Sequence, residues 1–335
     1  MKRLLQIIPL LLFFFTENAL AQNPIQQFWN LNGNQYLLDK AAPISAPSFA
    51  YSLRKLRRTY TGFALRVRRA ALLDNTEADV AFDMTGVVSG NSIVTIAATV
   101  PLTSGLNVGD KMSLSSFKGS LPLFATIWYD QGNKGYHATQ PGVLVQPELL
   151  LNTAGINNSK PSLSFNGGQY LAVGQPVQNL LNNGINGTFL TALKVGSNTV
   201  AQYSFGIVNG TTWRWSTHVN WSDRNGYFDA AEACCGISSR GFTNSTSLNV
   251  WKQYSFIRGT STKLVRRSNS TLINDASAPS TARTGGDFWI GGASGMPLLS
   301  TGFIGNLSEA VLFPKDFTLT EIGPTEFSQI EFWGL

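Results

Sequence analysis

Three acidic residues stand close together in one stretch of the sequence, at Asp223, Asp229 and Glu232. Residues two apart on a strand share a face, so Asp223 and Asp229 could both point into one cleft if their strand were unbroken. Asn225-Gly226 lies between them and is a hairpin signal, which leaves that continuity open. Two carboxyl groups held close together are the nucleophile and the proton donor of a retaining glycoside hydrolase. Their alternative role is to cap turns or bind solvent, and we favour that role.

The same carboxylate oxygens could also bind calcium, because hard cations prefer oxygen ligands. Their spacing matches no recognisable calcium loop, so we predict no metal and no cofactor, with calcium as the alternative. The two histidines, His137 and His218, lie far apart in the sequence and show no metal-binding spacing.

Tryptophans near these carboxylates predict a sugar-binding surface. Trp213 and Trp215 alternate along a strand-like segment, so they share one face, and Trp221 follows closely. Indole rings present broad apolar surfaces with one polar atom, which suits the C–H faces of sugars. The polar neighbours that could hydrogen-bond sugar hydroxyls are Arg214, Asn220 and Arg224. The alternative for at least one of these rings is a place in the hydrophobic core.

The only two cysteines of the sequence are adjacent, at Cys234 and Cys235. Two cysteines in an oxidising compartment are expected to pair, so we predict a vicinal disulfide. The alternative is a pair of thiols that stiffens a loop. Either form could contact a ligand.

Residues 1–21 have the three parts of a secretory signal peptide. Lys2 and Arg3 precede an apolar run from Leu4 to Phe15, and Ala19-Leu20-Ala21 forms a cleavage site. The run is shorter than the ~20 residues that span a bilayer, and no later stretch is a better candidate. We therefore predict a protein without a membrane span that is secreted, extracellular or periplasmic.

Composition favours many short strands and argues against nucleic acid as a partner. Only 13% of the residues are charged and 32 are glycine, which suits strands joined by tight turns. The net charge is a modest +6. The densest basic segment, Arg54 to Arg69, is interleaved with apolar residues, which is typical of a solvated helix or strand face.

The pattern of apolar residues predicts mostly strands with a few helices. Apolar residues at helical spacing predict a helix over Ser48–Tyr60, and a short closing helix is predicted over Thr320–Phe332. Near residues 87–120, Val, Ile and Thr alternate between glycine turns, which predicts an inserted β-ribbon. Short strands separated by turns every 8–12 residues across 141–335 predict a sandwich or a barrel.

Two sets of motifs cover most of residues 50–315. The first set comprises AYSLRKLR at 50–57, YTG at 60–62, RVRR at 66–69, WYDQGN at 128–133 and ATQ at 138–140. It resembles the α-L-arabinofuranosidase B catalytic-domain family. The second set comprises WSD at 221–223, YFD at 227–229, WKQYSF at 251–256 and GNLSE at 305–309. It resembles laminin-G-like and concanavalin-A-like lectin domains. Both resemblances imply an all-β fold over residues 48–335, a concanavalin-A-like jelly-roll sandwich with one or two short helices, behind a lead-in at 22–47.

The resemblance also implies where catalytic residues would stand. In the arabinofuranosidase family the nucleophile is a Glu immediately before an Asn-Gly pair, whereas here Arg224 precedes Asn225-Gly226. The acid of that family follows an Ile-Gly-Gly turn, whereas here Ala293 follows the matching turn. A vicinal disulfide lines the sugar site in that family and precedes the nucleophile segment, but Cys234-Cys235 follows the matching segment. The catalytic mechanism of the family is therefore not predicted for this chain.

Three functions from different classes follow from these features. The first is a secreted, lectin-like carbohydrate-binding protein whose partner is a glycan or polysaccharide. The alternative is an α-L-arabinofuranosidase-like glycoside hydrolase acting on arabinose-containing polysaccharides, and a second alternative is a structural or adhesion protein. Exposed tryptophans in a hollow would favour the first function. An acidic pair at glycosidase distance would favour the second, and a flat apolar face the third.

Overall fold

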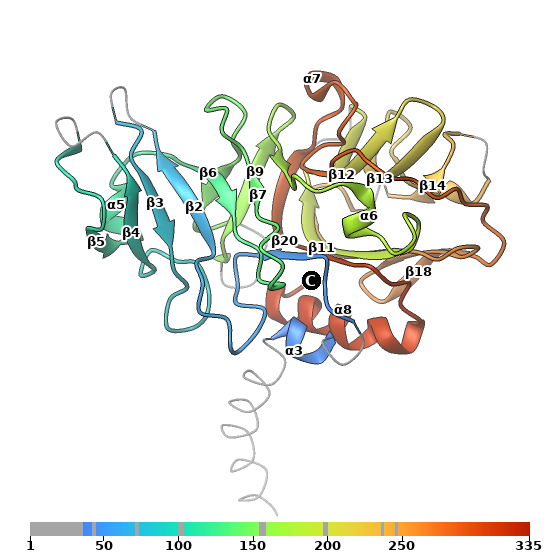
Figure 1. The fold of residues 1–335 in the computed structure, drawn as a ribbon, viewed down its shortest axis with the longest axis horizontal. Helices are drawn as coiled ribbons and strands as arrows, with labels where there is room; N and C mark the ends of the chain where they lie inside the picture. The colour runs from blue at the N-terminus through green and yellow to red at the C-terminus, as the bar shows by residue number, and fades with distance from the viewer. Residues whose placement is uncertain are drawn as a thin grey trace, which may run out of the picture.

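The computed structural model describes residues 36–41, 45–70, 74–99, 104–153, 159–196, 200–235, 238–244 and 247–335. The predicted signal peptide at residues 1–21 and much of the predicted lead-in lie outside them. The described chain is mostly antiparallel β-sheet, arranged as a sandwich of two sheets beside a smaller group of strands (Figure 1). The predicted all-β sandwich is confirmed.

The first sheet is built around β20 (Ile304–Phe313), which has partners along both edges. The partners on one edge are β1 (Phe49–Ser52) and β9 (Ser162–Asn166). Beyond the other edge the strands follow in the order β11 (Gly187–Val195), β16 (Trp251–Arg258), β17 (Lys263–Arg267) and β18 (Ser270–Asp275).

The second sheet faces the first across the hydrophobic core. Its strands follow in the order β7 (Ala138–Thr139), β10 (Leu171–Ala172), β19 (Trp289–Ile290), β12 (Gln202–Asn209), β13 (Trp213–Asn220), β14 (Asn225–Glu232) and β15 (Gly241–Thr243). Phe189 of β11 stacks on Phe205 of β12, with ring centroids 4.0 Å apart. Phe228 of β14 lies 5.3 Å from Phe256 of β16. These ring contacts fix one sheet against the other because aromatic side chains bury large apolar areas.

Strand β6 (Leu123–Trp128) connects both sheets to a further set of strands. It pairs with β7 of the second sheet and with β8 (Glu148–Leu150), which pairs with β9 of the first. From β6 the ladder continues through β2 (Leu65–Arg69), β3 (Glu77–Val80), β4 (Ile93–Ala98) and β5 (Lys111–Ser113). The segment predicted as an inserted ribbon contains β4, β5 and the short helix α5 (Leu114–Lys118). The division of the chain into a lead-in and one domain stays a prediction.

Helices α3 (Leu37–Ala41) and α8 (Leu319–Trp333) pack together over the first sheet, where α8 contacts β11 and β16 (Figure 1). α8 begins with a capping box formed by Thr318 and Glu321, and it confirms the predicted closing helix. Three shorter helical segments within the described residues are α6 (Val177–Leu180), α7 (Leu298–Thr301) and the 3₁₀ turn η2 (Ser238–Arg240). None of the helices in the described part of the chain has the length and apolar character needed to cross a bilayer.

The helix predicted over Ser48–Tyr60 is wrong, because its first half forms strand β1. β1 pairs with residues 309–312 of β20 and is buried on both faces. Phe49 and Tyr51 lie in the core between the sheets, whereas Ala50 belongs to the apolar cluster beneath α3 and α8. A strand buried on both faces loses the alternation of polar and apolar residues, so its sequence resembles that of a buried helix.

Candidate functional site

A cavity of about 470 Å³ lies over the second sheet, on the face turned away from the core. Strands β12, β13 and β14 form its floor, and the segments that follow β13 and β14 form its walls. The lining residues are Tyr203, Arg214, Trp221, Ser222, Asp223, Tyr227, Cys234, Cys235, Arg240 and Met296. Its size lies within the range of ~300–1,000 Å³ that is usual for ligand sites.

The register of the strands explains which side chains reach this cavity. Tyr203 of β12, His218 of β13 and Tyr227 of β14 form one cross-strand row. Ser216 and Asp229 belong to the next row. Residues paired across strands point to the same face, so both rows lie on the outer face of the sheet. Side chains at alternate positions of β13 therefore point either to the cavity or to the core.

The structure corrects the role predicted for Trp213 and Trp215. They share a face as predicted, but that face is the core, and their exposed fractions are only 3% and 0%. The indole N–H of Trp213 donates to the carbonyl of Thr281 at 2.8 Å, and that of Trp215 donates to the carbonyl of Ile185 at 3.1 Å. Neither ring offers a surface on which a sugar could stack.

Trp221 is the one residue of the three predicted tryptophans that lines the cavity. It follows the end of β13 and is half-buried. Its ring meets the ring of Tyr203 edge-on, with centroids 5.9 Å apart, and lies 4.9 Å from the ring of His218. These two contacts hold the indole over the outer face of the sheet.

The three polar residues predicted to bind sugar hydroxyls differ in their position relative to the cavity. Arg214 lines the cavity, and its guanidinium lies 3.4 Å from the hydroxyl of Tyr203. Asn220 is buried and donates to the carbonyl of Val200, so it does not line the cavity. Arg224 is exposed on the turn between β13 and β14, where its φ is 66°, and it lies outside the lining set. Of these three residues, we therefore keep only Arg214 as a candidate ligand contact.

Asp229, a predicted catalytic candidate, lies fully buried beneath the cavity. Arg240 donates to both of its carboxylate oxygens, each at 2.6 Å, and a guanidinium nitrogen of Arg214 lies 3.5 Å away. Nε2 of His218 is 3.3 Å from the same carboxylate. Burial alone would raise the pKa of Asp229, but these hydrogen bonds and charges outweigh it and hold the pKa well below its usual range. Asp229 is therefore ionised at neutral pH and is not placed to act as a proton donor.

Ser216, His218 and Asp229 have the residue types of a catalytic triad but not its geometry. The serine Oγ lies 3.4 Å from Nε2 of His218, and Asp229 contacts that same nitrogen. A triad needs the acid and the serine on opposite ring nitrogens, so that a proton can pass through the imidazole. All three residues are also buried. The arrangement is a buried polar network beneath the cavity.

Glu232, another predicted candidate, lies outside the cavity. The register across β13 and β14 leaves Ala231 as a bulge with φ of 55°. Glu232 is 3% exposed, accepts a hydrogen bond from Nζ of Lys263 on the first sheet and lies 3.9 Å from Arg258. Burial raises the pKa of Glu232, although its cationic partners oppose the shift. This carboxylate serves the contact between the two sheets.

Asp223 is the predicted carboxylate that does line the cavity, at its exposed rim. It accepts hydrogen bonds from the backbone N–H and the side chain of Asn225, at 3.0 and 3.1 Å, and from the hydroxyl of Tyr227. Its slight burial raises the pKa, but the hydrogen bonds from Tyr227 and Asn225 outweigh that effect and lower it. Asp223 thus caps a turn and also presents a negative charge to the cavity.

Cys234 and Cys235 form the predicted vicinal disulfide, and both residues line the cavity. The backbone N–H of Cys234 donates to the carbonyl of Thr211 at 2.9 Å, which ties this wall to the turn before β13. Cys235 is exposed. The disulfide therefore presents an apolar, polarisable surface in the wall of the cavity.

Several lining residues were not anticipated from the sequence. Tyr203 and Tyr227 come from β12 and β14, the strands on either side of β13, whose register the sequence does not reveal. Arg240 belongs to η2, and its guanidinium packs 4.5 Å from the ring centre of Tyr227. Met296 comes from the loop between β19 and α7. Among the described residues, no group of three His, Cys, Asp or Glu side chains is placed to hold a metal ion.

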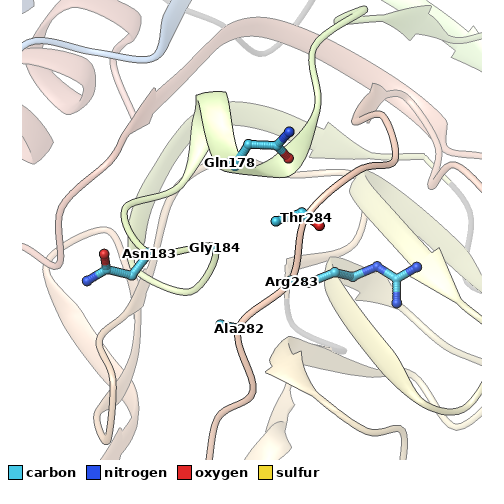
Figure 2. A pocket seen from close by; sticks show the side chains of 6 residues that line it. All are labelled: Gln178, Asn183, Gly184, Ala282, Arg283 and Thr284. Carbon is cyan, nitrogen blue, oxygen red and sulfur yellow. The ribbon is translucent and has the colours of Figure 1, made fainter.

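A second hollow, of about 370 Å³, lies between the turn after α6 and the segment 282–284 (Figure 2). Its lining includes Gln178, Asn183 and Arg283. In Figure 2 the side chains of Asn183 and Arg283 point away from one another and out of the gap. The guanidinium of Arg283 packs against Trp213 instead, 5.6 Å from its ring centre. The functional groups of this hollow do not converge on one ligand position.

No protein-family profile matches the sequence, and no curated protein matches it by sequence. The fold is similar to solved arabinofuranosidases. One is an arabinofuranosidase complexed with arabinofuranosyl-α-1,2-xylobiose, with a TM-score of 0.57 and 13% identity. Another is a mutant GH54 α-L-arabinofuranosidase soaked with 4-nitrophenyl α-L-arabinofuranoside, with a TM-score of 0.59 and 14% identity. Each match covers 87% of this chain and 63% of the other, so the chain spans less than two thirds of those proteins.

These comparisons define the class of the fold, an arabinofuranosidase-like β-sandwich. At 13–14% identity the likeness extends to the fold alone. The resemblance of the second half to laminin-G-like domains stays a prediction.

Proposed function

We propose that this chain is a secreted, lectin-like carbohydrate-binding protein that holds its sugar in the cavity over β12, β13 and β14. The observation that carries the proposal is the mixture of groups lining that cavity. Trp221 supplies an apolar ring at its edge, Arg214 and Arg240 supply N–H donors, and Asp223 supplies an acceptor. A sugar presents the matching groups, with C–H faces between hydroxyls that both donate and accept.

The alternative, an arabinofuranosidase-like hydrolase, has the fold likeness and the exposed carboxylate of Asp223 in its favour. A glycosidase needs a second carboxyl group, roughly 5–10 Å from the first. Asp229 is buried and paired with two arginines, and Glu232 is bound to Lys263 outside the cavity. Among the described residues that line the cavity, Asp223 is the one carboxylate. We therefore favour binding without hydrolysis.

The test is calorimetric titration of the mature protein with arabinoxylan and arabinan oligosaccharides, followed by chromatography of the same mixtures for released sugar. We expect binding without release. Trp221→Ala should weaken binding on the order of tenfold or more, because truncating an aromatic contact in a binding site costs about 2 kcal/mol. Phe327→Ala is the matched control, since Phe327 is 48% exposed on α8, over the other sheet.

The other outcomes would move the site or replace the proposed function by one of its alternatives. Equal binding by both variants would place the site elsewhere. Release of arabinose that is lost in Asp223→Asn would establish the hydrolase alternative. A folded protein that binds no sugar across a broad glycan panel would support the structural or adhesion alternative instead.

A further inference from the structure

Four charged side chains determine the electrostatic character of the cavity. Arg214, Arg240 and Asp223 line it, and Asp229 lies directly behind the two arginines. The side chains of the arginines are 11% and 17% exposed, whereas Asp229 is fully buried. Two positive charges are therefore matched by two negative charges within one small volume.

The neighbouring titratable groups do not disturb this balance. Burial lowers the pKa of His218 although Asp229 favours its charged form, so the imidazole is neutral at pH 7. Glu232 is paired with Lys263 and lies 3.9 Å from Arg258, and all three residues lie outside the lining set. Arg224 is exposed to solvent on the adjoining turn, where its charge is screened.

The carboxylate of Asp229 also determines what the guanidinium groups can still bind. An arginine has five N–H donors, and Arg240 directs two of its nitrogens to Asp229. Its remaining N–H groups can donate to neutral acceptors such as hydroxyl oxygens. An anionic ligand would have to compete with Asp229 for the same cations and would meet the repulsion of Asp223 at the rim.

Building on the proposed function, we propose that Asp229 is a specificity-determining, positioning residue that restricts the cavity to uncharged sugars and excludes uronic-acid or sulfated ones. It never touches the ligand. It acts by orienting Arg214 and Arg240 and by cancelling their excess charge.

The experiment compares two probes, a neutral arabino-xylo-oligosaccharide and an oligogalacturonide of similar length, titrated into the full mature protein at 0.15 M salt. The wild type should bind the neutral probe and show no measurable binding of the acidic one. Asp229→Asn should bind the neutral probe on the order of tenfold more weakly and gain binding of the acidic probe that disappears at high salt. Asp110→Asn, a carboxylate change on the ribbon before β5, is the control and should change neither affinity.

A charge-restoring variant separates specificity from a merely structural role. Adding Arg214→Gln to Asp229→Asn leaves one cation, Arg240, against one anion, Asp223, and should abolish the new affinity for the acidic probe. Should Asp229→Asn not fold, Asp223→Asn at the exposed rim replaces it and should gain binding of the acidic probe in the same way.

The outcomes distinguish this inference from the function on which it rests. A wild type that binds neither probe, nor any sugar of a broader panel, would overturn the proposed function and the inference with it. A wild type that binds the oligogalacturonide as well as the neutral probe would overturn only the inference. So would a folded Asp229→Asn or Asp223→Asn variant that gains no affinity for the acidic probe.

Discussion

At the scale of single residues, the partners of a side chain decide its chemistry. Asp223, Asp229 and Glu232 are acidic residues within ten positions of one another, yet they lie in three different environments. Asp223 caps an exposed turn, Asp229 is the buried counter-ion of two arginines, and Glu232 is buried against a lysine of the other sheet. Their proximity in sequence therefore does not make them a catalytic pair.

The buried neutral His218 predicts a pH dependence of stability. Its pKa in the folded protein is lowered by burial, whereas in the unfolded chain it is about 6.5. As the pH falls below about 6.5, the unfolded chain binds a proton that the folded protein resists, so stability decreases. We expect the melting temperature to fall between pH 7.5 and 5.5, and to fall less in His218→Gln.

Comparing the wild type with His218→Gln separates the effect of His218 on the melting temperature from that of His137. His137 also has a pKa lowered by burial, so the variant should retain the part of the fall that this residue causes. Thermal melts across the pH range give the result directly. An identical fall in both proteins would show that His218 does not contribute.

At the scale of elements, the buried carboxylate of Glu309 joins α8 to the first sheet. Glu309 of β20 is fully buried and accepts hydrogen bonds from Nε and Nη2 of Arg54, at 2.7 and 3.0 Å. From α8, the side chains of Gln329 and Trp333 also donate to it, each at 3.1 Å. The helix is thus held by polar contacts as well as by its apolar face.

Glu309→Gln should lower the free energy of unfolding by about 3–5 kcal/mol, the usual cost of removing one partner from a buried ion pair. The control is Glu321→Gln, which weakens the half-exposed capping box of the same helix and should cost about 1 kcal/mol. Urea titrations of both variants measure the difference. Losses of equal size would mean that the buried pair with Arg54 adds nothing beyond a surface contact.

At the scale of the whole molecule, the two outer faces of the sandwich differ. The outer face of the first sheet is covered by α3 and α8 (Figure 1). The outer face of the second sheet carries the cavity. Because the Arg54–Glu309 pair and the cavity belong to different sheets, their effects on stability and on binding should be separable.

Secretion is the prediction that concerns the whole chain. Expression of the complete sequence in a secreting host should yield a protein in the medium or periplasm that begins near Gln22, because residues 1–21 have the features of a cleaved signal peptide. Intact-mass measurement locates the N-terminus, and alkylation before reduction should modify neither cysteine. A product that keeps residues 1–21 would contradict the prediction.

The sequence by itself determined the all-β class, the closing helix and the vicinal disulfide. Each depends on local patterns, such as strand-length apolar segments between turns, a helix-length segment near the end of the sequence, and two adjacent cysteines. It also determined that Trp213 and Trp215 share a face. These features need no knowledge of distant residues.

Only the tertiary structure decided which faces are buried and which residues meet. The alternation of β13 defines two faces, but the packing of Phe228 and Phe256 between the sheets makes the face of Trp215 the core. For the same reason β1, covered on both sides, resembled a helix in sequence. The cavity joins Tyr203, Trp221 and Met296 from separate segments, and the roles of its carboxylates depend on arginines and a lysine that reach them through the fold. Burial and charge pairing arise from contacts between residues far apart in the chain, and a local pattern does not contain them.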